Sequence, residues 1–154
     1  MTYRIAGLDP DLFAHMHLLS DAELKTAGAE RVRVAEKPGA PCRISLDDAE
    51  IGETVLLLSF PHQQGETPYR QQGPIFVRET RDRFDAAGRM PPALARRTLS
   101  LRGYDARHNM IEADLVEGAE AETLVARFFA NSNVAYIHAH YAKRGCFAAR
   151  IDRA

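Results

Sequence analysis

The clearest alternation of hydrophobic and polar residues lies near the C-terminal end of the chain. Between residues 134 and 142, small or aliphatic side chains alternate with bulkier or polar ones, and the alternation resumes between residues 146 and 152. Each stretch is typical of a half-buried strand, because successive side chains of a strand point to opposite faces. The intervening Lys143-Arg144-Gly145 suits a three-residue turn, so the pattern predicts a β-hairpin that buries Phe147 with the aliphatic row.

The turn and the hydrophobic pattern favour the same register of this hairpin. A three-residue turn pairs His140 with Ala148 and His138 with Arg150, and a slip by one residue would split the hydrophobic row between the two faces. In this register the polar face carries His138, His140, Cys146 and Arg150. Cys146 then lies diagonal to His140, a separation that side chains can bridge.

Helices are predicted where capping residues precede apolar residues at helical spacing. Asp9-Pro10 is expected to begin one helix, and Ser20 with Glu23 forms the capping box of a second. A third helix is expected after Gly118. The residues expected on the buried faces are Leu12, Phe13, Met16 and Leu19 in the first helix, and Ala121, Leu124, Val125, Phe128 and Phe129 in the third.

Strands separated by turns occupy most of the remaining chain. The apolar run Val55–Phe60 predicts a strand buried on both faces, and a long polar loop, Pro61–Gly73, is expected to follow it. Other strands are expected at residues 2–8, 31–35, 75–79 and 98–105, with a partner strand that buries Ile111, Ala113 and Leu115. Hairpins in this order predict an α+β fold: a single domain over residues 1–154, with a mostly antiparallel sheet and a few helices on one face.

Composition and charge exclude several classes of function. The formal net charge of −1 gives no general attraction to nucleic acid or to a membrane surface. No apolar run is long enough to span a bilayer, and the N-terminal sequence lacks the pattern of a secretory signal. Cys42 and Cys146 are expected to be reduced thiols, so a cytoplasmic location is expected. No oligomeric state or particular cofactor is indicated.

Three segments resemble a known family. They are PCRISLDDAEIGE (residues 41–53), TPYR with the following GPIFVRE (residues 67–79), and YIHAHYAKRGC with the following ARIDRA (residues 136–154). Together they are similar to the bacterial domain-of-unknown-function family 1203, and the resemblance extends over almost the whole chain. The family is uncharacterised, so the resemblance implies no activity, ligand or catalytic residue.

A metal site is the first chemical interpretation of the hairpin. Two histidines separated by one residue on a strand point the same way, a geometry that suits zinc or iron. Cys146, or His62 from the polar loop, would supply a third ligand. Against this interpretation, Arg150 places positive charge opposite His138, so no metal ligand is assigned from the sequence.

A thiol nucleophile is the second interpretation. Positive charge from Lys143 and Arg144 favours the thiolate of Cys146, with His140 as base and either His138 or a loop carboxylate orienting it. The third interpretation is a pocket for a small anionic molecule, because arginine binds carboxylate and phosphate groups in a bidentate manner. Its candidate binding residues are Arg43, His62, Tyr69, Arg70, Lys143, Arg144 and Arg150.

The favoured function is binding of a small anionic molecule in a cleft between the hairpin and the Pro61–Gly73 loop. His140 is the candidate acid or base, His138 its neighbour, and Cys146 a possible nucleophile or ligand. Whether the protein is an enzyme stays open. The alternatives are a metal- or thiol-dependent enzyme that uses the same three residues, and a structural or interaction protein in which they only stabilise the fold.

Overall fold

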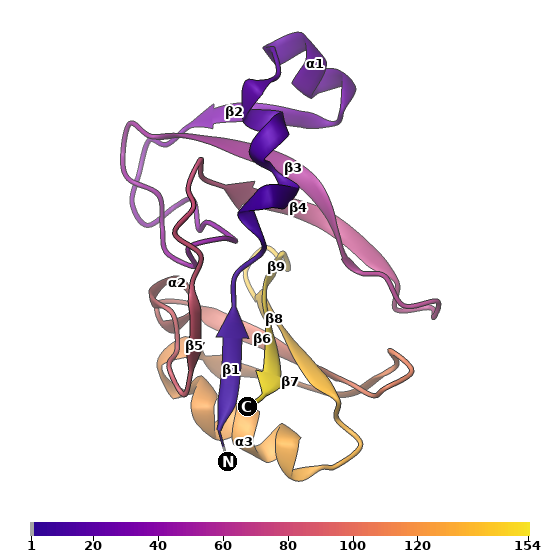
Figure 1. Ribbon diagram of the computed structural model, residues 1–154. Helices are drawn as coiled ribbons and strands as arrows, with labels where there is room; N and C mark the ends of the chain where they lie inside the picture. Colours follow the sequence, from indigo (N-terminus) through magenta and orange to yellow (C-terminus); the bar gives the residue numbers. More distant parts are fainter. Residues whose placement is uncertain (1) are drawn as a thin grey trace.

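The computed structural model describes residues 2–154 and contains two antiparallel sheets (Figure 1). In sheet order, the six-stranded sheet consists of β5 (Asp85–Ala87), β1 (Tyr3–Ala6), β9 (Phe147–Arg153), β8 (Tyr136–Tyr141), β6 (Thr98–Tyr104) and β7 (Met110–Glu117). The three-stranded sheet consists of β2 (Ala29–Arg33), β3 (Thr54–Gln63) and β4 (Gln71–Val77). The predicted α+β class with a mostly antiparallel arrangement and a C-terminal hairpin is confirmed.

The helices are few and short. They are α1 (Asp21–Thr26), α2 (Pro92–Ala95) and α3 (Ala121–Ala130), together with the 3₁₀ helices η1 (Pro10–Leu12), η2 (Ala14–Leu18) and η3 (Gly118–Glu120). Helix α1 begins with the predicted capping box, in which Ser20 and Glu23 satisfy each other's backbone N–H groups. None of the helices formed by residues 2–154 is long and apolar enough to cross a lipid bilayer.

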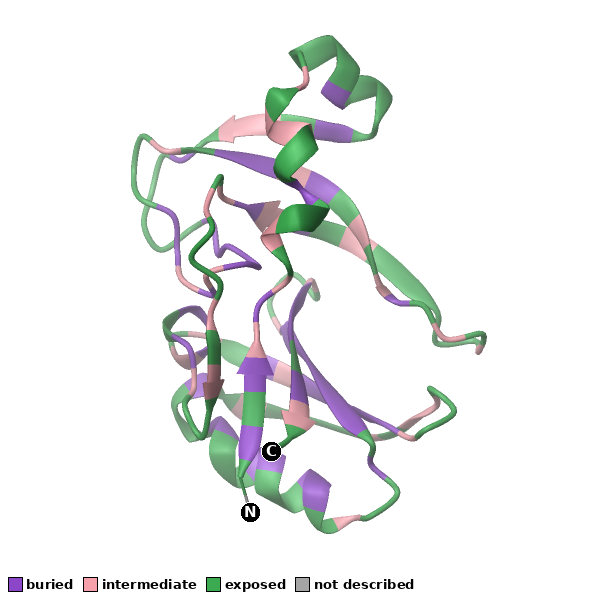
Figure 2. Ribbon diagram, in the orientation of Figure 1, coloured by how far each residue is buried: buried purple, intermediate pink, exposed green. Residues whose placement is uncertain are grey.

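Helix α3 covers one face of the six-stranded sheet (Figures 1 and 2). Its predicted apolar face is confirmed, with all five residues buried against the sheet. The strand residues that meet it include Leu99, Leu101, Ile137, Ala139 and Ile151. Since α3 occupies this face, side chains at the alternate positions of the same strands point toward the other sheet.

A second core lies under the three-stranded sheet. Leu56, Ile75 and Val77 from the strands pack there against Phe13 and Leu24. The connection between β2 and β3 runs between the sheets, where the N–H of Arg43 donates to the carbonyl of Phe76 and the N–H of Leu8 donates to the carbonyl of Arg43. This connection therefore fixes the three-stranded sheet to the end of β1.

The first predicted helix is instead a pair of 3₁₀ helices, η1 and η2. Asp9 does cap the first of them, accepting a hydrogen bond from the N–H of Asp11. Of the four residues expected to be buried, only Phe13 is, and Leu12 is 51 % exposed. Met16 and Leu19 are half-buried and pack against the same core as Phe13. A 3₁₀ helix has three residues per turn, so residues 13, 16 and 19 share a face while Leu12 points away from it.

The prediction that Ile111, Ala113 and Leu115 face the core is wrong. All three are exposed, Leu115 by 64 %, and Val116 packs against the core instead. Strand pairing is the reason: Val116 lies opposite the buried Leu99, and residues directly opposite each other share a face. As the edge strand of the sheet, β7 tolerates apolar residues on its open side.

The predicted loop Pro61–Gly73 is shorter than expected. Strand β3 continues through Gln63 and β4 begins at Gln71, so the connection covers residues 64–70 only. The two strands stay paired because a bulge between Phe60 and Gln63 accommodates Pro61. His62 therefore belongs to a strand, which gives its side chain a defined direction.

Candidate functional site

The C-terminal hairpin has the predicted pairing at one end and a bulge at the other. His138 lies opposite Arg150 as expected, but His140 lies opposite Phe147 rather than Ala148, because the register shifts between Ala139 and His140. An extra residue in β9 changes which side chains face each way. Phe147 consequently lies against the histidines, and the prediction that it joins the core on the opposite face is wrong.

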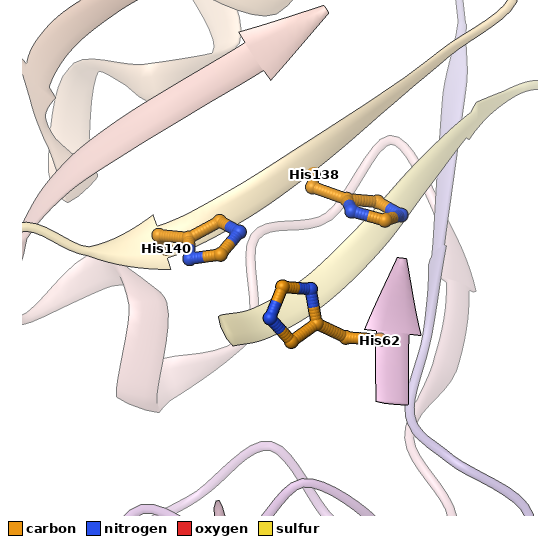
Figure 3. A group of neighbouring side chains, drawn as sticks. All are labelled: His62, His138 and His140. Carbon is orange, nitrogen blue, oxygen red and sulfur yellow. The ribbon is translucent and has the colours of Figure 1, made fainter. Parts of the chain in front are cut away.

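Three histidines from two sheets meet beside this bulge (Figure 3). His138 and His140 occupy alternate positions of β8 and point the same way, and His62 faces them from the end of β3. One ring nitrogen of each lies within 4.8 Å of the corresponding nitrogens of the other two. His138 and His140 are 3 % and 0 % exposed, whereas His62 is half-buried and lies nearest to solvent.

Aromatic rings surround the three imidazoles. The ring of Phe147 stacks on His62 with a centroid separation of 5.1 Å and meets the edge of His138 at the same separation. On its other side, His138 lies 5.0 Å from the ring of Tyr104 and 5.2 Å from that of Tyr136. These contacts restrict how the imidazoles can rotate, and they offer the ring nitrogens no hydrogen-bond partner.

Each of the three rings has a buried nitrogen without a hydrogen-bond partner within residues 2–154. Nδ1 of His140 lies 2.9 Å from the carbonyl oxygen of Gly145. Because a carbonyl only accepts, Nδ1 must carry the hydrogen and Nε2 is left with a free lone pair. Within residues 2–154, the buried nitrogens Nε2 of His140, Nδ1 of His138 and Nδ1 of His62 have no hydrogen-bond partner. Burying such groups unpaired costs free energy, so their arrangement requires an explanation.

Burial keeps the three imidazoles neutral. It lowers the pKa of His138 to about 2, with further lowering by the neighbouring histidines and by Arg150 and Arg102. Burial likewise lowers the pKa of His140 to about 3, against the opposing effect of its bond to Gly145. Burial and Arg102 lower the pKa of His62 to about 4. At neutral pH all three are therefore lone-pair donors.

Two arginines flank His138 in the sheet, one on each neighbouring strand. Arg150 on β9 donates from Nε to both carboxylate oxygens of Asp152, at 2.9 and 3.1 Å, and its guanidinium lies 4.1 Å from the ring centre of Tyr136. Arg102 on β6 lies directly opposite His138. Arg102 was not among the residues predicted for the site. Its alternation with the buried Leu101 indicates the face that it shares with the histidines, but only once β6 is known to pair with β8.

The other candidate residues lie outside this group. The thiol of Cys146 is 4.0 Å from the carbonyl of Arg144 and supplies none of the clustered atoms. Arg43 is 2 % exposed and donates to the carbonyls of Phe147 and Pro41, with its guanidinium over the ring of Tyr141. The exposed candidates are Tyr69, Arg70, Lys143 and Arg144. The structure therefore unites His62, His138 and His140, with Arg150 beside them.

Comparison with known proteins gives a family without a described activity. A family model described as a protein of unknown function (DUF1203) matches residues 39–153, a range that includes all three clustered histidines. No curated protein and no solved structure matches the chain. On the strength of the family match, the chain belongs to the DUF1203 family.

Proposed function

We propose that this protein binds a divalent transition-metal ion through His62, His138 and His140, and a small anionic molecule at that metal. The observation that carries the proposal is the convergence of three neutral imidazoles whose buried nitrogens have no other partner within residues 2–154. A metal ion would satisfy all three lone pairs at once, which accounts for the free-energy cost of burying them.

The donor set and its spacing suit a metal of the zinc type. Imidazole nitrogen is a preferred ligand of zinc, iron, nickel and copper ions. With Zn–N bonds of about 2.1 Å, a tetrahedral site holds its nitrogens about 3.4 Å apart, so a bound ion would draw together nitrogens that already lie within 4.8 Å of one another. Three protein ligands leave a fourth position for water or another ligand, as in catalytic rather than structural zinc sites.

The surroundings of the site support the same assignment. The carbonyl of Gly145 orients His140 through Nδ1, which is the outer contact that metal-binding histidines usually make. Three neutral ligands leave the full charge of the ion uncompensated, and this favours an anion at the fourth position. A bound metal would lower the pKa of coordinated water or polarise a bound ligand, so the site is compatible with either binding or catalysis. A cytoplasmic location fits two free cysteines.

The test is metal analysis of the protein purified without a histidine tag. We expect about one metal ion per chain after equilibration with zinc, and a loss of at least tenfold in affinity for His62→Gln and for His138→Gln. His15→Gln is the matched control, because His15 is exposed and outside the cluster. Circular dichroism verifies that each variant is folded. A wild-type protein that takes up none of zinc, iron, cobalt, nickel or copper would overturn the proposal.

A further inference from the structure

Arg102 is a cation without a counter-charge beside the three histidines. Its side-chain partners in residues 2–154 carry no negative charge: they are the amide oxygen of Gln71, 3.3 Å from Nη1, and the hydroxyl of Tyr104. It differs in this from Arg150, the other arginine next to His138, whose charge is offset by Asp152. Arg102 is only half-buried, so a molecule that enters from solvent can reach it.

Arg102 lies on the same face of the sheet as His138 and His140. It lies opposite His138 on β6, and Ser100, two residues away on the same face, lies opposite His140. The charge of Arg102 contributes to the low pKa of each of the three histidines, so it acts on the entire group. An arginine in this place opposes a cation that binds alone, because like charges repel in a poorly solvated site.

A ligand between the metal ion and Arg102 can compensate the positive charge of both. A divalent ion on three neutral histidines carries +2, and Arg102 adds +1; within residues 2–154 the clustered ligand group contains no carboxylate, and the bond of Arg102 to Gln71 is to a neutral amide. An anion in contact with both centres would compensate the metal and the guanidinium together. In that arrangement Arg102 contributes to ligand binding and no longer weakens the metal site.

We propose that the anionic ligand is an oxyanion with at least two oxygen atoms, a carboxylate or a phosphate, with one oxygen on the metal and another on the guanidinium of Arg102. This assignment rests on the proposed metal site and specifies the chemical class of the anion bound there. The planar guanidinium presents paired N–H donors whose spacing matches two oxygens of one such group. A halide offers a single atom and cannot use this spacing, so the site should discriminate against it.

The other arginines near the hairpin are less suited to this role. Arg150 is held by Asp152 and Tyr136, and the buried Arg43 is held by two backbone carbonyls against the ring of Tyr141. Arg144 is exposed in the hairpin turn. Arg102 is therefore the residue that we expect to determine specificity.

The experiment uses protein loaded with Co²⁺, whose visible absorption reports on the ligands of the metal. We expect acetate and phosphate to change the spectrum with saturable binding, and chloride to bind at least about tenfold more weakly than either. In Arg102→Gln, cobalt should stay bound while the dissociation constants of acetate and phosphate rise at least about tenfold. In Arg102→Lys, which keeps the charge and loses the paired donors, the rise should be smaller. Arg144→Gln is the control and should match the wild type.

The outcomes separate the two proposals. Unchanged oxyanion affinity in Arg102→Gln, or chloride binding as tight as that of acetate and phosphate, would overturn the assignment to Arg102 while the metal site stands. A wild-type protein that binds no cobalt would overturn the metal site itself. Should Arg102→Gln fail to fold, Arg102→Lys decides, because wild-type acetate and phosphate affinities in that variant would also contradict the paired contact.

Discussion

His62 and Phe147 lie with their rings parallel, 5.1 Å apart between centroids and 1° apart in plane, although they belong to different sheets. Phe147 also contacts His138 and His140, so one phenyl ring touches all three imidazoles. The proposed metal ligands are thus positioned by a side chain that has no metal-binding atom. The ring of Phe147 therefore contributes both to the packing of the two sheets against each other and to the geometry of the site.

Phe147→Leu is expected to weaken metal binding more than a comparable core substitution does. Leucine fills much of the volume but removes the flat surface against which His62 is held, so zinc affinity should fall about tenfold and the free energy of unfolding by about 1–2 kcal/mol. Isothermal titration with zinc and urea unfolding measure the two effects. Phe129→Leu, on the buried face of α3, is the control: it should lower stability without changing zinc affinity. Equal zinc affinity in both variants would contradict a positioning role of Phe147.

The metal-free protein is expected to lose stability as the pH falls below about 6.5. The unfolded chain protonates its histidines near that pH, whereas burial holds the pKa of His138 at about 2 and that of His140 at about 3 in the folded state. Above pH 6.5 neither state is protonated and there is no effect. Below it the unfolded state binds protons that the folded state excludes, so the free energy of unfolding falls by up to about 1.4 kcal/mol per pH unit for each histidine.

Urea unfolding at half-unit steps between pH 7.5 and 5 measures this dependence. His138→Gln should show a shallower slope, and His15→Gln should follow the wild type because His15 is exposed. Zinc should extend the stable range to lower pH, since it competes with protons for the same nitrogens. Stability that stays constant from pH 6.5 to 5 in the metal-free protein would contradict the burial of neutral imidazoles.

Asp48→Asn is expected to destabilise the protein by about 3 kcal/mol at neutral pH. The Asp48 side chain is fully buried and accepts hydrogen bonds from Arg96 and Arg97, and these arginines lower its pKa although burial alone would raise it. The stabilisation is present above the unfolded pKa of about 3.9 and is lost as the pH falls through the folded value. Asp114→Asn, which breaks the exposed pair with Arg127, should cost less than about 1 kcal/mol. Thermal and urea unfolding would refute the expectation if the two variants were equally stable.

Cys146→Ser is expected to leave zinc affinity and oxyanion binding unchanged. The thiol lies outside the histidine group, so a thiol-dependent mechanism and the metal site make opposite predictions for this variant. Cys42 is fully buried and accepts hydrogen bonds from two backbone N–H groups, so an aromatic disulfide reagent should modify Cys146 alone in the native protein. If modification and Cys146→Ser both abolished metal or anion binding, Cys146 would have to be part of the binding site.

Features set by neighbouring residues were predictable from the sequence. The capping box at Ser20, the buried face of α3 and the pairing of His138 with Arg150 each depend on a short stretch of chain. Local patterns determine these features because capping, helical periodicity and tight turns involve residues close in sequence. The fold class followed from the order in which such elements occur.

Features set by contacts between distant segments were not predictable in the same way. Which face of β7 is buried depends on its pairing with β6. The position of Phe147 depends on a bulge that no turn residue in the sequence indicates. His62 was a candidate third ligand, but only the packing of β3 against the hairpin brings it to His138 and His140. Arg102 was missed because its neighbour across the strands is more than thirty residues away in the chain.

The place of β9 in the sheet has a consequence for how the protein is made. β9 follows β8 in the chain, yet in the sheet it lies between β8 and β1, which are far apart in sequence. Until the ribosome has released residues 147–153, β1 and β8 each have an unpaired edge, and His138 and His140 lack the ring of Phe147. Before β9 docks, the free edges of β1 and β8 can pair with another chain, so folding of this sheet is open to aggregation until its central strand is in place. The three histidines acquire their contacts with Phe147 only when β9 has taken its place between β1 and β8.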